Sequence, residues 1–237
     1  MWTEEKLAEL PQVNGFRQRG MDMTRLETFT DAAFAFALTL LVISFDNIPT
    51  SIAELNAALK NIPAFAASFL LIAMFWYAHH KWSRRFGLDD VVTVVLSLIF
   101  VFVTLVFVFP LRLMASAFLS WITQGWVPFE LDEASGNVVA YVFVVYGAGF
   151  VCMSTMICLL YVHALRVKEL NLNSLERFIA KAELQAWLIL LSSGVLSTLI
   201  ATLAPPQYRA WAGLAYAPLG IIMPIWGYWK SRQEATA

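Results

Sequence analysis

The chain alternates long apolar stretches with short polar connections. Six stretches reach the length of about 20 residues that a membrane-spanning helix needs, and turn-forming runs such as Asn47-Ile48-Pro49-Thr50 and Pro205-Pro206 separate some of them. The sequence contains no series of alternating strands typical of a transmembrane barrel. The pattern predicts an all-α, polytopic membrane protein with one domain over residues 1–237 and spans at about 26–46, 62–82, 90–112, 138–164, 182–204 and 209–229.

Composition supports this prediction. Hydrophobic residues make up 59% of the chain and charged residues 14%, whereas soluble domains carry roughly 25% charged residues. The formal net charge of −1 argues against a nucleic-acid partner, which a basic protein would bind through phosphate contacts. We therefore expect a multi-pass protein of the cell membrane with the lipid bilayer as its surroundings.

Lysine and arginine are distributed unevenly between the two sides that these spans would create. Thirteen of the sixteen lie in the two terminal segments and in the connections after the second and fourth spans, and three lie in the remaining connections. Cytoplasmic loops carry an excess of these residues. Both termini are therefore predicted to be cytoplasmic.

The first span contains an acidic residue, Asp31, near its cytoplasmic end. An ionisable residue inside a span is costly and needs partners. Arg25 lies six residues earlier, about 240° around the helix, so it points to a different side. The second span brings Trp76, His79 and His80 to a similar depth, and they are the expected partners. Such a network acts either as a structural clamp or in permeation or catalysis, and we favour the clamp.

Deeper in the first span, Phe36, Leu40 and Ile43 follow at i, i+4 and i+7 and form one stripe. Almost any stripe of a membrane span is apolar, so this spacing alone does not assign a role. Thr39 is the one hydroxyl in the middle of this helix. Its simplest role is a hydrogen bond to the carbonyl of the residue four positions earlier.

Two motifs resemble a known family. The run Arg25-x-x-x-Phe29-Thr30-Asp31, followed by Ala35, Thr39 and Leu40-Leu41, resembles the Arg-x-x-x-Phe-Ser-Asp signature of the transmembrane protein 175 family of potassium channels. The run Trp76-Tyr-Ala-His79-His80 resembles the Trp-x-x-His pattern of the second helix of that family. Together the two motifs cover the first two spans, about a third of the chain.

The resemblance implies a homotetramer whose first helices line a central pore for K⁺, without a cofactor or a bound metal beyond the permeating ion. By position, Phe36 would form the narrowest hydrophobic layer, Thr39 would lie near it and bear on selectivity, and Leu40 and Ile43 would also face the pore. The remaining motif residues would brace the helices rather than touch the ion: Arg25, Thr30, Asp31, Trp76, His79 and His80.

The chain departs from the family pattern at two positions. Thr30 replaces the serine of the signature and keeps its hydroxyl, whereas Phe36 stands where isoleucine or leucine is usual. Four phenyl rings could close a constriction more tightly than aliphatic side chains, or swing aside. Phe36 is therefore expected to change conductance, downward in the first case and upward in the second.

Other function classes fit the sequence less well. A TVGYG-like loop, whose carbonyls form the common potassium filter, is absent, so any filtering must come from side chains or a hydrophobic constriction. An ion- or proton-coupled secondary transporter remains the main alternative, although such carriers place ionisable groups and broken helices near the midplane. An intramembrane enzyme is disfavoured because His79 and His80 are adjacent and diverge by about 100°, and a purely structural protein is the last alternative.

Overall fold

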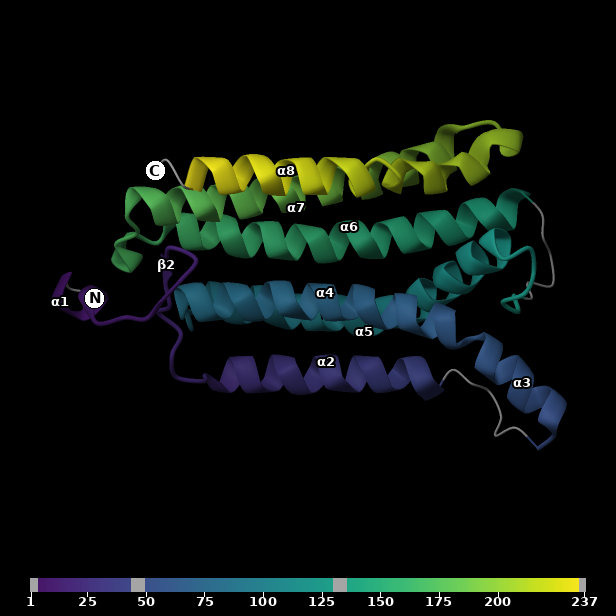
Figure 1. The fold of residues 1–237 in the computed structure, drawn as a ribbon, viewed down its shortest axis with the longest axis horizontal. Coiled ribbons are helices and arrows are strands. Elements are labelled where there is room, and N and C mark those ends of the chain that lie inside the picture. The colour runs from purple at the N-terminus through teal and green to yellow at the C-terminus, as the bar shows by residue number, and fades with distance from the viewer. Residues whose placement is uncertain (1–3, 44–49, 130–135, 235–237) are drawn as a thin grey trace.

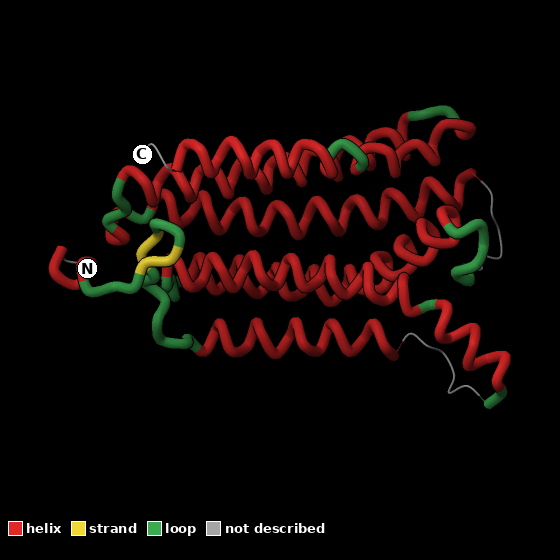
Figure 2. The backbone as a smooth tube through the Cα atoms, in the orientation of Figure 1, coloured by secondary structure: helices red, strands yellow, loops and turns green. Residues whose placement is uncertain are grey.

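The computed structural model describes residues 4–43, 50–129 and 136–234. Long helices lie side by side in an elongated bundle, with both termini at the same end (Figure 1). Apart from one small hairpin, the regular elements of these described ranges are helices (Figure 2). In chain order these elements are α1 (Glu4–Ala8), β1 (Gln12–Val13), β2 (Phe16–Arg17), α2 (Arg25–Ile43), α3 (Ile52–Lys60), α4 (Ile62–Phe86), α5 (Val91–Ile122), α6 (Gly136–Arg166), the 3-10 helix η1 (Lys168–Leu170), α7 (Ser174–Leu203), the 3-10 helix η2 (Pro206–Tyr216) and α8 (Leu219–Glu234).

The helical membrane architecture expected from the apolar pattern is confirmed. Five helical stretches of the described chain are long and apolar enough to cross a membrane: Ile52–Phe86, Val91–Ile122, Ala140–Arg166, Ser174–Leu203 and Pro206–Gln233. Helix α2 coincides with the first predicted span but is not among these five, and residues 44–46 of that predicted span lie outside the described residues.

Several predicted boundaries differ from the observed ones. Helix α4 continues to Phe86 and ends at Gly87, which adopts the left-handed conformation (φ 57°), and α5 continues to Ile122 rather than ending near 112. The sixth predicted span is not one continuous α-helix, because its first part is the 3-10 helix η2 and α8 begins after Pro218. Pro218 has no N–H to donate to a preceding turn. A hydropathy pattern locates a span but not its caps.

The core joins four helices through aromatic rings. Phe75 of α4 lies within ring-contact distance of Phe100 of α5, Phe150 of α6 and Trp187 of α7, with centroid separations of 6.3, 5.7 and 5.3 Å. All four side chains are buried. Offset and edge-on aromatic pairs contribute about 0.5–1.5 kcal/mol each beyond the burial of their area. Helix α2 lies outside this centre, against α4 and α5, at one edge of the bundle (Figure 1).

The N-terminal strap, residues 12–20, ties two helix ends together. Arg17 and Arg19 place guanidinium nitrogens 2.6 and 2.9 Å from the buried Glu176 carboxylate at the start of α7. The hydrogen bond to Glu176 raises the pKa of Arg17 above its ordinary value. At the other end of the strap, the Gly20 N–H donates to the Arg84 carbonyl of α4 at 3.0 Å. The strap then continues towards α2.

Candidate functional site on helix α2

Helix α2 has one covered face and one uncovered face. Phe34, Ala37 and Leu41, spaced at i, i+3 and i+7, are buried towards the bundle, as this spacing requires for one face of a helix. On the other side, Phe29 and Phe36, which are seven residues apart and share one stripe, are 53% and 56% exposed, and Val42, about 120° further around the helix, is 51% exposed. A single copy of the chain therefore leaves an apolar stripe of α2 uncovered.

The four predicted pore-lining residues have different surroundings. Phe36 and Thr39 are exposed on the uncovered face, whereas Leu40 is half-buried and packs against the core. Ile43 ends α2, and its side chain lies outside the described part of the structure. The Thr39 hydroxyl donates to the Phe36 carbonyl at 2.7 Å, three residues back rather than the four expected. Its proton is thus engaged by the helix itself.

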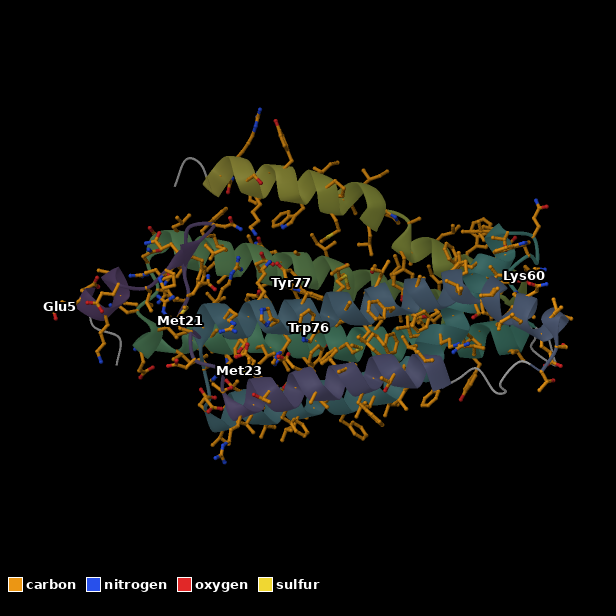
Figure 3. The ribbon with its side chains drawn as sticks, turned by 60° about the horizontal axis from the view of Figure 1, so that its bottom comes forward. Glu5, Met21, Met23, Lys60, Trp76 and Tyr77 are labelled. Atoms are coloured by element: carbon orange, nitrogen blue, oxygen red, sulfur yellow. The ribbon has the colours of Figure 1, made fainter. Side chains whose placement is uncertain are left out.

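Asp31 is bonded to the neighbouring helix. The indole N–H of Trp76 on α4 donates to a carboxylate oxygen of Asp31 at 2.8 Å. The Trp76 ring stacks on the His80 imidazole, with centroids 5.4 Å apart and planes 23° from parallel. Figure 3 shows Trp76 on the side of α4 towards α2. This contact holds the polar end of α2 against α4.

A second acidic residue, which our reading of the sequence missed, extends this contact. Glu27 is 3% exposed, and its carboxylate lies 3.5 Å from the Arg84 guanidinium and 3.6 Å from the His80 imidazole. The spacing could have revealed it, because Glu27 and Asp31 are four residues apart, as are Trp76, His80 and Arg84. Residues four apart share one face of a helix, so the two rows face each other. We call Glu27, Asp31, Trp76, His80 and Arg84 the polar brace.

The other predicted members of the network lie elsewhere. His79 is buried and lies 3.0 Å from the Ser97 hydroxyl of α5, with its ring stacked on Phe100. Thr30 is fully buried, and its hydroxyl has no hydrogen-bond partner among the described residues. Arg25 is exposed at the start of α2, and within the described chain it makes no ion pair with Asp31.

The adjacent histidines serve different neighbours. His79 faces α5, whereas His80 lies beside Glu27 of α2. Within residues 4–43, 50–129 and 136–234, no three His, Cys, Asp or Glu side chains gather in a group that could hold a metal ion. Glu27 and Asp31 of α2 instead contact polar side chains of α4.

Comparison with known proteins points to one family. The family model described as endosomal/lysosomal potassium channel TMEM175 matches residues 25–110, which include α2, α4 and most of α5. A protein named potassium channel from Marivirga tractuosa is 38% identical over 197 residues, covering 80% of this chain and 79% of that protein. A crystal structure of a variant of the potassium channel MtTMEM175, in complex with a nanobody–MBP fusion protein, is similar with a TM-score of 0.79 and 34% identity, and the match covers 94% of this chain and all of that one.

Proposed function

Because the chain belongs to the TMEM175 family of potassium channels, we propose that it forms a potassium-permeable cation channel in which α2 lines the pore. The uncovered apolar stripe of α2 is the observation that carries this proposal. It lies on a helix at one edge of the bundle that packs against α4 and α5. The relatives bear the names of potassium channels rather than of carriers or enzymes, which disfavours a secondary transporter.

The pore requires several copies of the chain. One copy leaves the stripe with Phe29 and Phe36 uncovered, and a closed symmetric ring is the usual way in which identical chains cover such a face. In a homotetramer, four α2 helices around the axis would enclose a passage lined by this stripe. Channel pores of this kind need no cofactor.

The narrowest layer of the proposed pore is a ring of Phe36 side chains. Phe36 projects from the uncovered face, and hydrophobic constrictions gate channels by excluding water. Thr39 lies about one turn further along the same face and would offer the lone pairs of its hydroxyl oxygen near the constriction. Leu40 and Ile43 complete the proposed lining, with Leu40 partly held against the core.

The polar brace would position α2 rather than contact the ion. Both of its carboxylates have partners on α4: Asp31 accepts from Trp76, and Glu27 lies beside Arg84 and His80. Groups paired in this way hold one helix against another. Arg25, Thr30 and His79 lie within two residues of members of the polar brace in the sequence. We assign them to the support of the same end of α2.

We also propose six membrane spans with cytoplasmic termini. Helix α2, the first span along the chain, is added to the five long apolar stretches. Both termini lie at one end of the bundle (Figure 1). At that end, α4 ends and α5 begins, and α6 ends and α7 begins (Figure 1). These segments carry thirteen of the sixteen lysines and arginines, so the positive-inside rule assigns this end to the cytoplasm.

A flux assay tests the function. Purified protein in liposomes loaded with K⁺ should dissipate the gradient without ATP or a cotransported solute, because a pore needs neither. Potassium efflux is measured with an ion-selective electrode and compared with protein-free liposomes and with Na⁺-loaded ones. A flux that saturates and requires a second, coupled ion would contradict the channel and favour the secondary transporter.

A further inference from the structure

A cavity of about 760 Å³ lies at the end of the bundle that holds the termini. It is open on one side and lined by the hairpin of the N-terminal strap, α4, α7 and α8. Tyr77, which lies on the side of α4 towards α8 (Figure 3), is part of its wall. Ligand-binding cavities usually measure about 300–1,000 Å³. The cavity therefore has room for a small ligand or a lipid headgroup.

The lining of this cavity is strongly basic. Four cationic side chains and one carboxylate, Glu183, contribute to it. Lys81 and Lys230 place their ammonium nitrogens 2.7 and 2.8 Å from the same oxygen of Glu183, and Arg85 lies 3.5 Å from it. Among the described lining residues, one carboxylate thus faces three cations. Like charges gathered in one site repel each other, and a further anion would offset that repulsion.

Arg85 has unused hydrogen-bonding capacity beside this carboxylate. Its side chain is 8% exposed, and its Nη1 atom, which lies 3.5 Å from Glu183 Oε1, makes no hydrogen bond to the described residues. The guanidinium lies over the Phe16 ring of the strap, 5.0 Å from the ring centroid, which holds it in place. A buried guanidinium N–H without an acceptor is costly, and a ligand oxygen in the cavity could accept from it.

We propose that this cavity binds an anionic phosphate group through Lys81, Arg85 and Lys230. Phosphate monoesters carry a charge near −2 and offer several strong acceptor oxygens, which matches an excess of two positive charges. The headgroup of an anionic lipid is the favoured source, because the cavity lies between the ends of membrane helices, where basic pockets meet lipid phosphates. Free phosphate is the other source of the same chemistry. The proposal does not depend on ion conduction.

Binding is tested on the full-length protein in a non-ionic detergent. Dioctanoyl phosphatidic acid should raise the unfolding midpoint and bind measurably, whereas dioctanoyl phosphatidylcholine should not. Lys230→Gln removes one of the cations that surround Glu183 and leaves two, so it should fold, and we expect it to weaken phosphatidic acid binding about tenfold, as loss of one charge-assisted hydrogen bond does. Lys181→Gln is the matched control, since Lys181 is exposed on the same α7 as Glu183 but does not line the cavity.

A second variant tests the place of binding without changing charge. Ser231, on α8, lines the cavity and is exposed, and Ser231→Trp should fill its space and weaken phosphatidic acid binding at least as much as Lys230→Gln. Displacement of the lipid by millimolar inorganic phosphate would identify free phosphate as a ligand, and failure of that competition would identify the lipid headgroup. Equal affinities for the two lipids, or equal losses in Lys230→Gln and Lys181→Gln, would overturn the proposal.

Discussion

At the scale of single residues, Phe34 and Phe36 are chemically identical and lie two positions apart on α2. Phe34 is 2% exposed and packs on Phe100 with centroids 5.3 Å apart, whereas Phe36 is 56% exposed. Two residues along a helix correspond to a rotation of about 200°, so the two rings point to nearly opposite sides. The phase of the helix, and not the residue type, thus separates a core residue from a candidate pore residue.

Phe36→Ala is expected to increase the rate of potassium efflux from liposomes. Removal of the ring widens the proposed constriction and lowers its barrier to water and ions. Because the Phe36 side chain is 56% exposed in a single copy, the free energy of unfolding of the chain should change by less than about 1 kcal/mol. Both quantities are measured on the same preparation.

Phe102→Ala provides the matched control for this prediction. Phe102 lies on α5 and is 68% exposed, so the substitution removes an equally accessible ring from another helix. We expect it to leave the efflux rate unchanged. An efflux rate of Phe36→Ala equal to that of the unchanged protein would remove Phe36 from the proposed constriction.

At the scale of elements, the N-terminal strap connects helices that are distant in the sequence. Its two arginines meet one buried carboxylate, Glu176, which also closes a capping box with Asn173 at the start of α7. The same strap reaches the end of α4 and leads into α2. The position of the proposed pore helix is therefore linked to the packing of α7 through this strap.

Glu176→Gln should lower the free energy of unfolding by about 3 kcal/mol, because removal of one member of a buried ion pair leaves uncompensated charge. Here two guanidinium groups would lose their carboxylate. Denaturant unfolding in detergent, followed by tryptophan fluorescence, measures the change. Glu169→Gln, at an exposed position of the 3-10 helix η1, is the control and should change stability by less than about 0.5 kcal/mol. Equal stability of the two variants would show that the ion pairs of the strap contribute little to the free energy of unfolding.

At the scale of the whole molecule, the placement of α2 at one edge of the bundle (Figure 1) favours assembly over a monomeric pore. The apolar stripe of that helix has no counterpart within the described chain that could enclose a passage with it. A second copy, or several, would supply that counterpart.

We predict that the protein extracted in a mild detergent has the mass of four chains of 26.6 kDa each, as measured by native mass spectrometry. Phe29→Glu should reduce the tetrameric fraction, because it places a charge on the stripe that copies would cover. Tyr141→Glu, on an exposed position of α6, should leave the mass unchanged. A monomeric protein that still conducts K⁺ in liposomes would contradict the assembly.

The parts of the fold and of the site that could be predicted from the sequence are those that depend on the pattern of consecutive residues. Helices α4 to α7 lie where apolar runs of about 20 residues predicted them. Asp31 and Trp76 were expected to meet because both lie near the same end of successive spans. Glu27 was missed because its partner row on α4 becomes visible only when two helix faces are compared. The hairpin of the strap was missed because two-residue strands leave no periodic pattern.

The sequence by itself determined the class of protein and the two motifs of its family, since hydropathy and a signature on one helix are properties of consecutive residues. Only the tertiary structure decided which face of α2 remains uncovered, that His79 and Arg25 lie outside the polar brace, and that Lys81, Arg85 and Lys230 meet around Glu183. Those outcomes depend on the rotation of each helix about its axis. That rotation follows from packing between helices far apart in the chain.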